Sequence, residues 1–132
     1  MTNAYREDYV RAVYVIGERK GAVRGKELAG YLGVSKNTVS EMLSRLRKEG
    51  LVKYENYGPL ALTSRGRRLA KDLTAKHRLI ELFLTKVLKR DPGDVHEEAC
   101  LLEHDFSNES LDQMRRLLGN PKTDPHGSRI VW

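Results

Sequence analysis

The stretch that decides the fold reads "VSKNTVSEMLSRLRKEGLVKYENYGPLALT" and covers residues 34–63. Its first part carries apolar residues at helical spacing and predicts a helix that stops at Gly50. Two short apolar runs around the turn residues "NYGP" follow and predict a β-hairpin. Just upstream, "RGKELAGYLGV" predicts a shorter helix closed by Gly33. Two helices with a short turn between them and then a hairpin are the order of a winged helix-turn-helix.

The outer face of the second helix carries side chains that suit DNA. Small hydroxyls and an amide near its N-terminus allow a close approach to base edges, and its cations suit phosphates. The predicted DNA contacts are Ser35, Lys36, Asn37, Thr38, Ser40, Arg45 and Arg47, with Tyr57 at the hairpin tip. A solvated helical hairpin and a winged helix that binds protein stay open as alternatives.

The charges are distributed unevenly along the 132 residues, whose net charge is +6. Residues 1–71 contain 15 Lys and Arg against 7 Asp and Glu, a net charge of +8. Residues 72–132 contain 9 against 11, a net charge of −2. The basic half is expected to meet polyanions and the acidic half cations.

The composition, 39% hydrophobic and 32% charged, is typical of a folded, charge-rich helical protein of one or two small domains. No stretch is apolar enough to span a bilayer, and "MTNAYREDYV" lacks the apolar core of a signal peptide. The single cysteine excludes an internal disulfide. We therefore expect a cytoplasmic protein that does not associate with membranes.

The run "HEEACLLEH", residues 96–104, concentrates side chains that bind metals. On a helix, His96, Cys100, Glu103 and His104 lie on one narrow face. Imidazole, thiolate and carboxylate groups together suit a transition metal. The alternative is a solvated acidic helix that carries one buried cysteine.

One helix cannot surround an ion, so a second element must contribute ligands. A long helix predicted from about residue 64 to about residue 89 offers His77 and Glu81 one turn apart. The first predicted helix offers Asp8. Each also has a structural interpretation, because a histidine is often a hydrogen-bonded core residue and Asp8 can pair with Arg11.

The sequence resembles the diphtheria toxin repressor family of metal-dependent regulators, including its manganese-transport-regulator branch. The matching words are "EDYVRAVYVI", "VSKNTVSEMLSRLRKEGLV", "LTSRGRRLA", "KHRLIELFL" and "VHEEACLLEH", in the family order. The resemblance implies a homodimeric transcriptional repressor, not an enzyme. It also implies that a divalent metal acts as co-repressor and enables binding to palindromic operator DNA of metal-homeostasis genes.

The resemblance also implies two metal sites. The residues that match the primary site are Asp8, Cys100, Glu103 and His104, and those that match the ancillary site are His77, Glu81 and His96. Cys100 and Arg11 resemble the iron branch, whereas Asp8 resembles the manganese branch. These matches favour Fe²⁺ and keep Mn²⁺ open, with Co²⁺, Ni²⁺ and Zn²⁺ as surrogates.

We therefore predict a mainly α protein. Residues 1–71 form the winged helix-turn-helix domain, and residues 72–120 form a helical dimerisation and metal-binding domain whose long helix begins near residue 64. Further helices are expected at about 94–104 and 108–118. Residues 121–132 are expected to form a linker or tail, without the SH3-like domain of iron-type members. The apolar residues expected at the dimer contact are Leu82, Phe83, Leu101 and Leu117.

Two other functions stay open. A winged-helix regulator could respond to another ligand or to oxidation of Cys100. A small zinc hydrolase is the other, but the chain contains no H-E-x-x-H motif and no glycine-rich phosphate loop.

Overall fold

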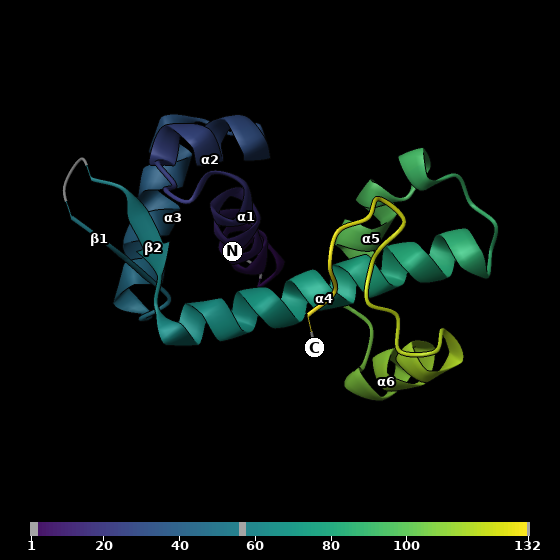
Figure 1. The fold of residues 1–132 in the computed structure, drawn as a ribbon. Helices are drawn as coiled ribbons and strands as arrows, with labels where there is room; N and C mark the ends of the chain where they lie inside the picture. Colours follow the sequence, from purple (N-terminus) through teal and green to yellow (C-terminus); the bar gives the residue numbers. More distant parts are fainter. Residues whose placement is uncertain (1–2, 56–57, 132) are drawn as a thin grey trace. The chain divides into compact units, whose positions relative to one another are not determined.

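The computed structural model describes residues 3–55 and 58–131, and it is mainly helical with one small sheet, as predicted (Figure 1). The chain divides into two compact units, residues 1–71 and 72–132. None of the helices described is long and apolar enough to cross a membrane.

Ahead of the long helix that begins at Ser64, the described part of the first unit contains three helices and a two-stranded sheet, the elements of the predicted winged helix-turn-helix. They are α1 (Asn3–Lys20), α2 (Gly25–Leu32), α3 (Lys36–Lys48), β1 (Val52–Tyr54) and β2 (Leu60–Leu62). The strands are antiparallel, with Lys53 opposite Ala61. The hairpin tip, including Tyr57, lies outside the described residues.

The turn between α2 and α3 is built by two local signals. Gly33 closes α2 in the left-handed conformation, with φ 67°, which costs glycine little. Ser35 caps α3, and its hydroxyl accepts a hydrogen bond from the backbone N–H of Thr38 at 3.1 Å. Behind this turn, Leu28 and Leu46 are fully buried in the core of the unit. The two helices are therefore held on one shared core, and the polar face of α3 is left outside.

The start of α4 (Ser64–Lys86) is fixed against the end of α3. The Thr63 hydroxyl donates to the carbonyl of Gly50 at 2.6 Å and accepts from the N–H of Gly66 at 3.1 Å. A Cβ on Gly66 would lie 1.9 Å from the carbonyl oxygen of Leu51. Only glycine fits at this position without a shift of the backbone.

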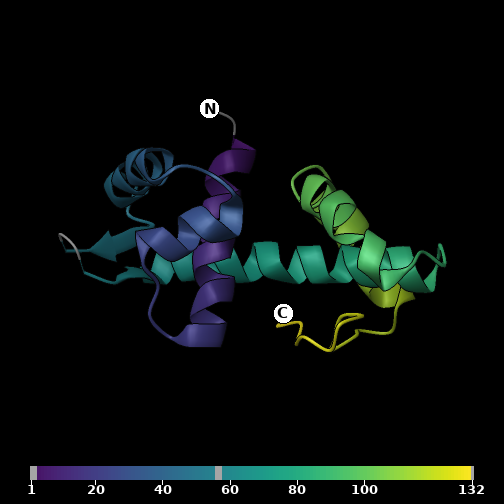
Figure 2. The ribbon, with the colours of Figure 1, turned by 90° about the horizontal axis from the view of Figure 1, so that it is seen from above.

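In the second unit, α5 (His96–Leu102) and α6 (Asn108–Leu117) pack on α4, preceded by a 3₁₀ turn at Pro92–Asp94 (Figures 1 and 2). The helices are shorter than the sequence predicts, because α4 ends at Lys86 and α5 spans only residues 96–102. The buried residues of this core are Leu79, Ile80, Leu84, Val95, Ala99, Leu111 and Met114.

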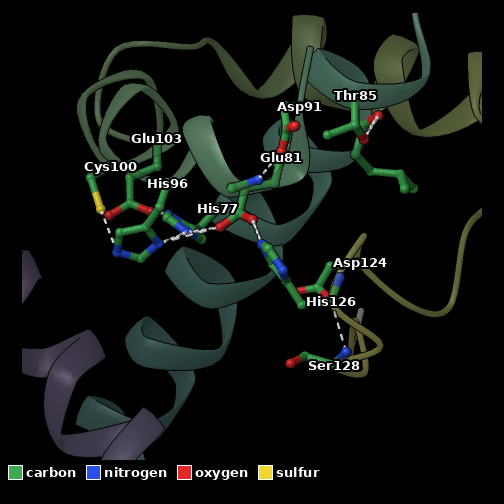
Figure 3. A network of polar contacts seen from close by, with 12 residues as sticks. His77, Glu81, Thr85, Asp91, His96, Cys100, Glu103, Asp124, His126 and Ser128 are labelled. Atoms are coloured by element: carbon green, nitrogen blue, oxygen red, sulfur yellow. Dashed lines mark hydrogen bonds and ion pairs between the residues drawn. The ribbon is translucent and has the colours of Figure 1, made fainter. Parts of the chain in front are cut away.

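A linker or tail is expected for residues 121–132, of which the structure describes 121–131; these residues contain a turn that belongs to the second unit. Asp124 is buried and accepts hydrogen bonds from the backbone N–H groups of His126 and Ser128, at 2.9 and 2.8 Å (Figure 3). The Arg78 guanidinium donates to the backbone carbonyl of Arg129, and Ile130 is buried. The segment therefore packs on α4.

Candidate metal centre and nucleic-acid interface

Four side chains of ligand type converge between α4 and α5 (Figure 3). One turn apart on α4, His77 and Glu81 are joined by an ion pair between Nε2 and Oε1. The Nδ1 atom of His96 lies 3.2 Å from Nε2 of His77 and 3.5 Å from Oε1 of Glu81. Cys100 follows one turn after His96, with its Sγ 3.6 Å from Nε2 of His96. The two imidazoles and the thiol each place one ligand atom within 4.8 Å of the others.

Glu103 extends this cluster. Its Oε2 lies 2.9 Å from Nδ1 of His77, and its side chain is fully buried. The same imidazole therefore contacts carboxylates from both sets of ligands implied by the resemblance, Glu81 of the ancillary set and Glu103 of the primary set. The remaining primary residue of this unit, His104, is largely buried, with its Nε2 3.6 Å from Oε1 of Glu103. In the first unit, Asp8 lies on α1 and is partly exposed.

His126 joins the cluster although the sequence did not single it out. Its Nε2 lies 2.9 Å from Oε2 of Glu81, and the Asp124 turn holds its backbone. No periodicity marks "TDPHGS", so the only available signal was a fourth histidine in a chain that already offers metal ligands. Glu81 thus lies among His77, His96 and His126.

The electrostatics of the cluster follow from these contacts. Burial raises the pKa of Glu81, but hydrogen bonds from His77 and His96 and the positive charge of His77 and His126 outweigh burial and hold it well below its usual value. For His96, hydrogen bonds with Cys100 and Glu81 raise the pKa to about 9. At neutral pH, Glu81 is therefore ionised and the neighbouring His96 is protonated.

The chemistry of these donors fits a divalent transition metal. Imidazole nitrogens, a thiol and two buried carboxylates are ligands of borderline ions such as Fe²⁺ and Zn²⁺, and carboxylates also suit Mn²⁺. Buried carboxylates need a positive partner, which protonated His96 supplies to Glu81 in this arrangement and which a bound cation would supply in its place.

Apart from Tyr57, which lies outside the described residues, the predicted DNA contacts are exposed. They lie at the N-cap of α3 or along the helix, away from its buried stripe of Val39, Met42, Leu43 and Leu46. Lys36, Asn37 and Ser40 are exposed. A hollow of about 490 Å³ between α3 and the hairpin is lined by Lys36 and also by Lys26, a cation at the start of α2 that the prediction did not include.

Several predicted contacts have partners within the protein. The Ser35 and Thr38 hydroxyls lie 2.8 Å apart in the cap of α3. The Arg45 Nε atom lies 3.8 Å from a carboxylate oxygen of Glu49. The helical wheel places Arg47 on the outer face, but its guanidinium lies over the ring of Tyr54 in β1, 4.5 Å from the centroid.

Two family models match this chain. The model for the N-terminal DNA-binding domain of iron-dependent repressors matches residues 1–60, and the model for the metal-binding and dimerisation domain matches residues 63–131. The chain belongs to the iron-dependent repressor family. This membership confirms the resemblance seen in the sequence.

The relatives within the iron-dependent repressor family are named as transcription regulators, not as enzymes. The regulator MntR of Bacillus subtilis is 33% identical over 118 residues, covering 89% of this chain and 82% of its own length. The iron-dependent repressor IdeR of Mycobacterium tuberculosis is 36% identical over 124 residues, covering 94% of this chain and 54% of its own.

Solved structures of manganese-dependent regulators match nearly all of this chain. A manganese-dependent transcriptional repressor in complex with manganese has a TM-score of 0.90 and 37% identity, covering 96% of this chain and 58% of that one. The manganese regulator SloR has a TM-score of 0.86 and 38% identity, with coverage of 96% and 59%. The chain thus spans somewhat more than half the length of these solved relatives.

Proposed function

We propose that this protein is a metal-dependent transcriptional repressor, in which a divalent ion acts as co-repressor and enables a homodimer to bind palindromic operator DNA in the cytoplasm. The observation that carries this proposal is the convergence of His77, Glu81, His96, Cys100 and Glu103 inside the segment that matches the family's metal-binding and dimerisation domain. The basic first unit, with the exposed polar face of α3, would be the part that contacts DNA.

For the metal we favour Fe²⁺. Cys100 provides a soft ligand, and Arg11 stands where the iron branch has a basic residue. Mn²⁺ is the second candidate, supported by Asp8 and by the manganese regulators among the structural neighbours. One neighbour, ScaR, binds Zn²⁺ and Cd²⁺ in its structures, which supports the use of surrogate ions in experiments.

The ligands would form two sites. His77, Glu81 and His96 would hold the ancillary ion, with His126 as a further ligand from the Asp124 turn. Cys100, Glu103, His104 and Asp8 would hold the primary ion, an assignment that rests on the family resemblance. A bound cation would supply positive charge that stabilises these carboxylates further. Because that charge favours one conformation of the dimer, DNA should in turn tighten metal binding.

In that conformation the two copies of α3 would meet successive major grooves, roughly 34 Å apart. The exposed apolar residues of the second unit support a dimer contact there. Leu101 is 71% exposed and Leu117 is 68% exposed. Leu82 is buried and Phe83 packs on the core, so we assign the contact to the two exposed leucines rather than to all four predicted residues.

The test is DNA binding under a metal series. Duplexes are selected from a randomised pool by the full chain with Mn²⁺, and fluorescence anisotropy then measures affinity with Fe²⁺ under anoxic conditions, with Mn²⁺, and with chelator. We expect affinity to rise at least tenfold with metal, and the response to be lost when Cys100→Ala and Glu103→Ala are combined. Equal affinity with chelator and with metal would overturn the co-repressor role.

A second function, regulation by thiol oxidation, is favoured by one observation. Cys100 is partly exposed and its sulfur lies beside an imidazole. If hydrogen peroxide changes the DNA affinity of the chelator-treated chain, and Cys100→Ser abolishes that change, oxidation is the signal. If peroxide has no effect on that form, this alternative fails.

A further inference from the structure

Glu41 is a carboxylate in the middle of the outer face of α3. Taking about 100° per residue, it lies roughly opposite the buried stripe formed by Val39, Met42, Leu43 and Leu46, in the same direction as Asn37 one turn earlier. Its side chain is exposed. It is the only acidic residue from Lys36 to Lys48. An acid therefore stands at the centre of the surface that the proposed function brings into the major groove.

Within the described residues, no side chain or backbone group forms an ion pair or a hydrogen bond with the Glu41 carboxylate. Arg45 follows one turn later, at the spacing that normally gives an ion pair on a helix. Its Nε atom, however, lies 3.8 Å from Oε1 of Glu49. Glu49 also accepts from Arg6, at 3.1 Å. Across residues 3–55 and 58–131, Glu41 has neither a hydrogen bond nor an ion pair. The carboxylate of Glu41 therefore faces solvent and is available to a bound molecule.

The charge of Glu41 restricts what it can contact in DNA. Phosphates repel a carboxylate, and a carboxylate offers only acceptors. It therefore cannot form a hydrogen bond with the base atoms of the major groove that are themselves acceptors, such as N7 and O6 of guanine and O4 of thymine. The donors there are the N4 amino group of cytosine and the N6 amino group of adenine. Adenine presents its amino group beside the N7 acceptor, which suits the amide of Asn or Gln, whereas the cytosine amino group suits a carboxylate.

From this geometry we infer that Glu41 accepts a hydrogen bond from the N4 amino group of a cytosine in each half-site and thereby requires a C·G pair at that position. This inference rests on the proposed function. Glu41 lowers the affinity for DNA that lacks this cytosine, because its charge then faces the groove without a donor. It is a specificity-determining residue and not a source of general affinity.

The experiment compares the full chain with Glu41→Ala and with Glu18→Ala, each loaded with Mn²⁺. Glu18 is the matched control, because it is an exposed acid of α1 in the same unit and outside α3. Each protein selects duplexes from a randomised pool. We expect the wild-type chain and Glu18→Ala to select a palindrome with a fixed cytosine in each half, and Glu41→Ala to select the same palindrome with that position free.

A second measurement removes only the amino group. In the selected duplex the fixed cytosine is replaced by 2-pyrimidinone, which lacks the N4 group. Binding of the wild-type chain is expected to weaken roughly tenfold or more, and binding of Glu41→Ala to change by less than about twofold. Equal penalties for both proteins, or an unchanged cytosine preference in Glu41→Ala, would overturn the inference while the repressor function stands. If the wild-type chain selects no duplex with metal, both proposals fall.

Discussion

His77 and Glu103 are joined by a 2.9 Å contact between Nδ1 and Oε2, although 26 residues separate them along the chain. The side chains of both residues are almost completely buried, with 6% and 0% exposed. The other ring nitrogen of His77 contacts Glu81, which is also buried. One imidazole therefore contacts two buried carboxylates.

Replacing His77 by alanine is expected to lower the free energy of unfolding of the metal-free chain by about 3 kcal/mol, because two buried carboxylates lose the imidazole that contacts them both. The measurement is urea unfolding followed by circular dichroism. Glu98→Ala is the control, since it breaks an exposed pair with Arg90 and should cost less than about 1 kcal/mol. If the two variants lose similar amounts of unfolding free energy, the buried contacts of His77 stabilise the chain no more than an exposed ion pair does.

The stability of the metal-free chain is expected to depend on pH in two directions. The pKa of Glu81 lies below its unfolded value of 4.5, so its contribution is present above pH 4.5 and is lost as the pH falls below it. The pKa of His96 is raised from 6.5 to about 9, so its contribution is full below pH 6.5 and is lost as the pH rises towards 9. The midpoint of urea unfolding should be highest between about pH 4.5 and pH 6.5. The decrease of this midpoint at alkaline pH should be smaller in His96→Gln. An unchanged alkaline fall in His96→Gln would assign it to another group.

Gly66→Ala is expected to destabilise the first unit by several kcal/mol, because the new Cβ would lie 1.9 Å from the carbonyl oxygen of Leu51. Gly30 provides the comparison. It lies in α2 with open space around it, so Gly30→Ala should be neutral or stabilising by up to about 1 kcal/mol. Thermal unfolding of both variants tests the pair. Equal melting temperatures would show that the backbone around Leu51 and residue 66 can move apart without loss of stability.

The contact of Arg47 with Tyr54 leads us to expect a structural role for this arginine. Lys36→Ala should lower the slope of log affinity against log salt by about 1, as loss of a phosphate contact does, whereas Arg47→Ala should leave the slope unchanged. A double-mutant cycle of Arg47→Ala and Tyr54→Leu should give a coupling of about 0.5–1 kcal/mol in stability. If Arg47→Ala reduces the slope of log affinity against log salt and shows no coupling to Tyr54, Arg47 contacts a phosphate instead.

His126→Ala is expected to weaken binding of Mn²⁺ to the α4–α5 cluster about tenfold, because its imidazole lies 2.9 Å from a carboxylate oxygen of Glu81. Competition with a chromophoric chelator measures the affinity. Arg129→Ala, an exposed side chain in the same segment, is the control and should bind as the wild-type chain does. If the two variants bind equally well, His126 makes no contribution to metal binding.

The parts of this structure that the sequence predicted are those in which spacing determines geometry. The buried stripe of α3 follows from residues three and four apart, and Gly33 and Ser35 mark the turn before it. His77 with Glu81, and His96 with Cys100, are one turn apart, so each pair had to share a face. That the two faces meet follows from the apolar residues beside them, which pack α5 on α4.

Other features depend on contacts that spacing does not encode. A helical wheel gives the direction of Arg47 but not its rotamer, and the ring of Tyr54 decides where the guanidinium lies. The segment around His126 has no periodicity, and its position depends on a turn at Asp124 and on Arg78 of α4. The early end of α4 and the short α5 are set by local turns, where helix boundaries vary most.

The hydrogen bonds that His77 makes to Glu81 and Glu103 have a consequence for sensitivity. An arriving ion must displace protons and break these internal bonds, so the concentration at which the protein responds depends on their strength as well as on the ligands. Substitutions around the cluster that strengthen or weaken these bonds would move the response threshold up or down without changing a single ligand. In the proposed repressor, the contacts that His77 makes without metal would therefore help to set the metal concentration needed for the response.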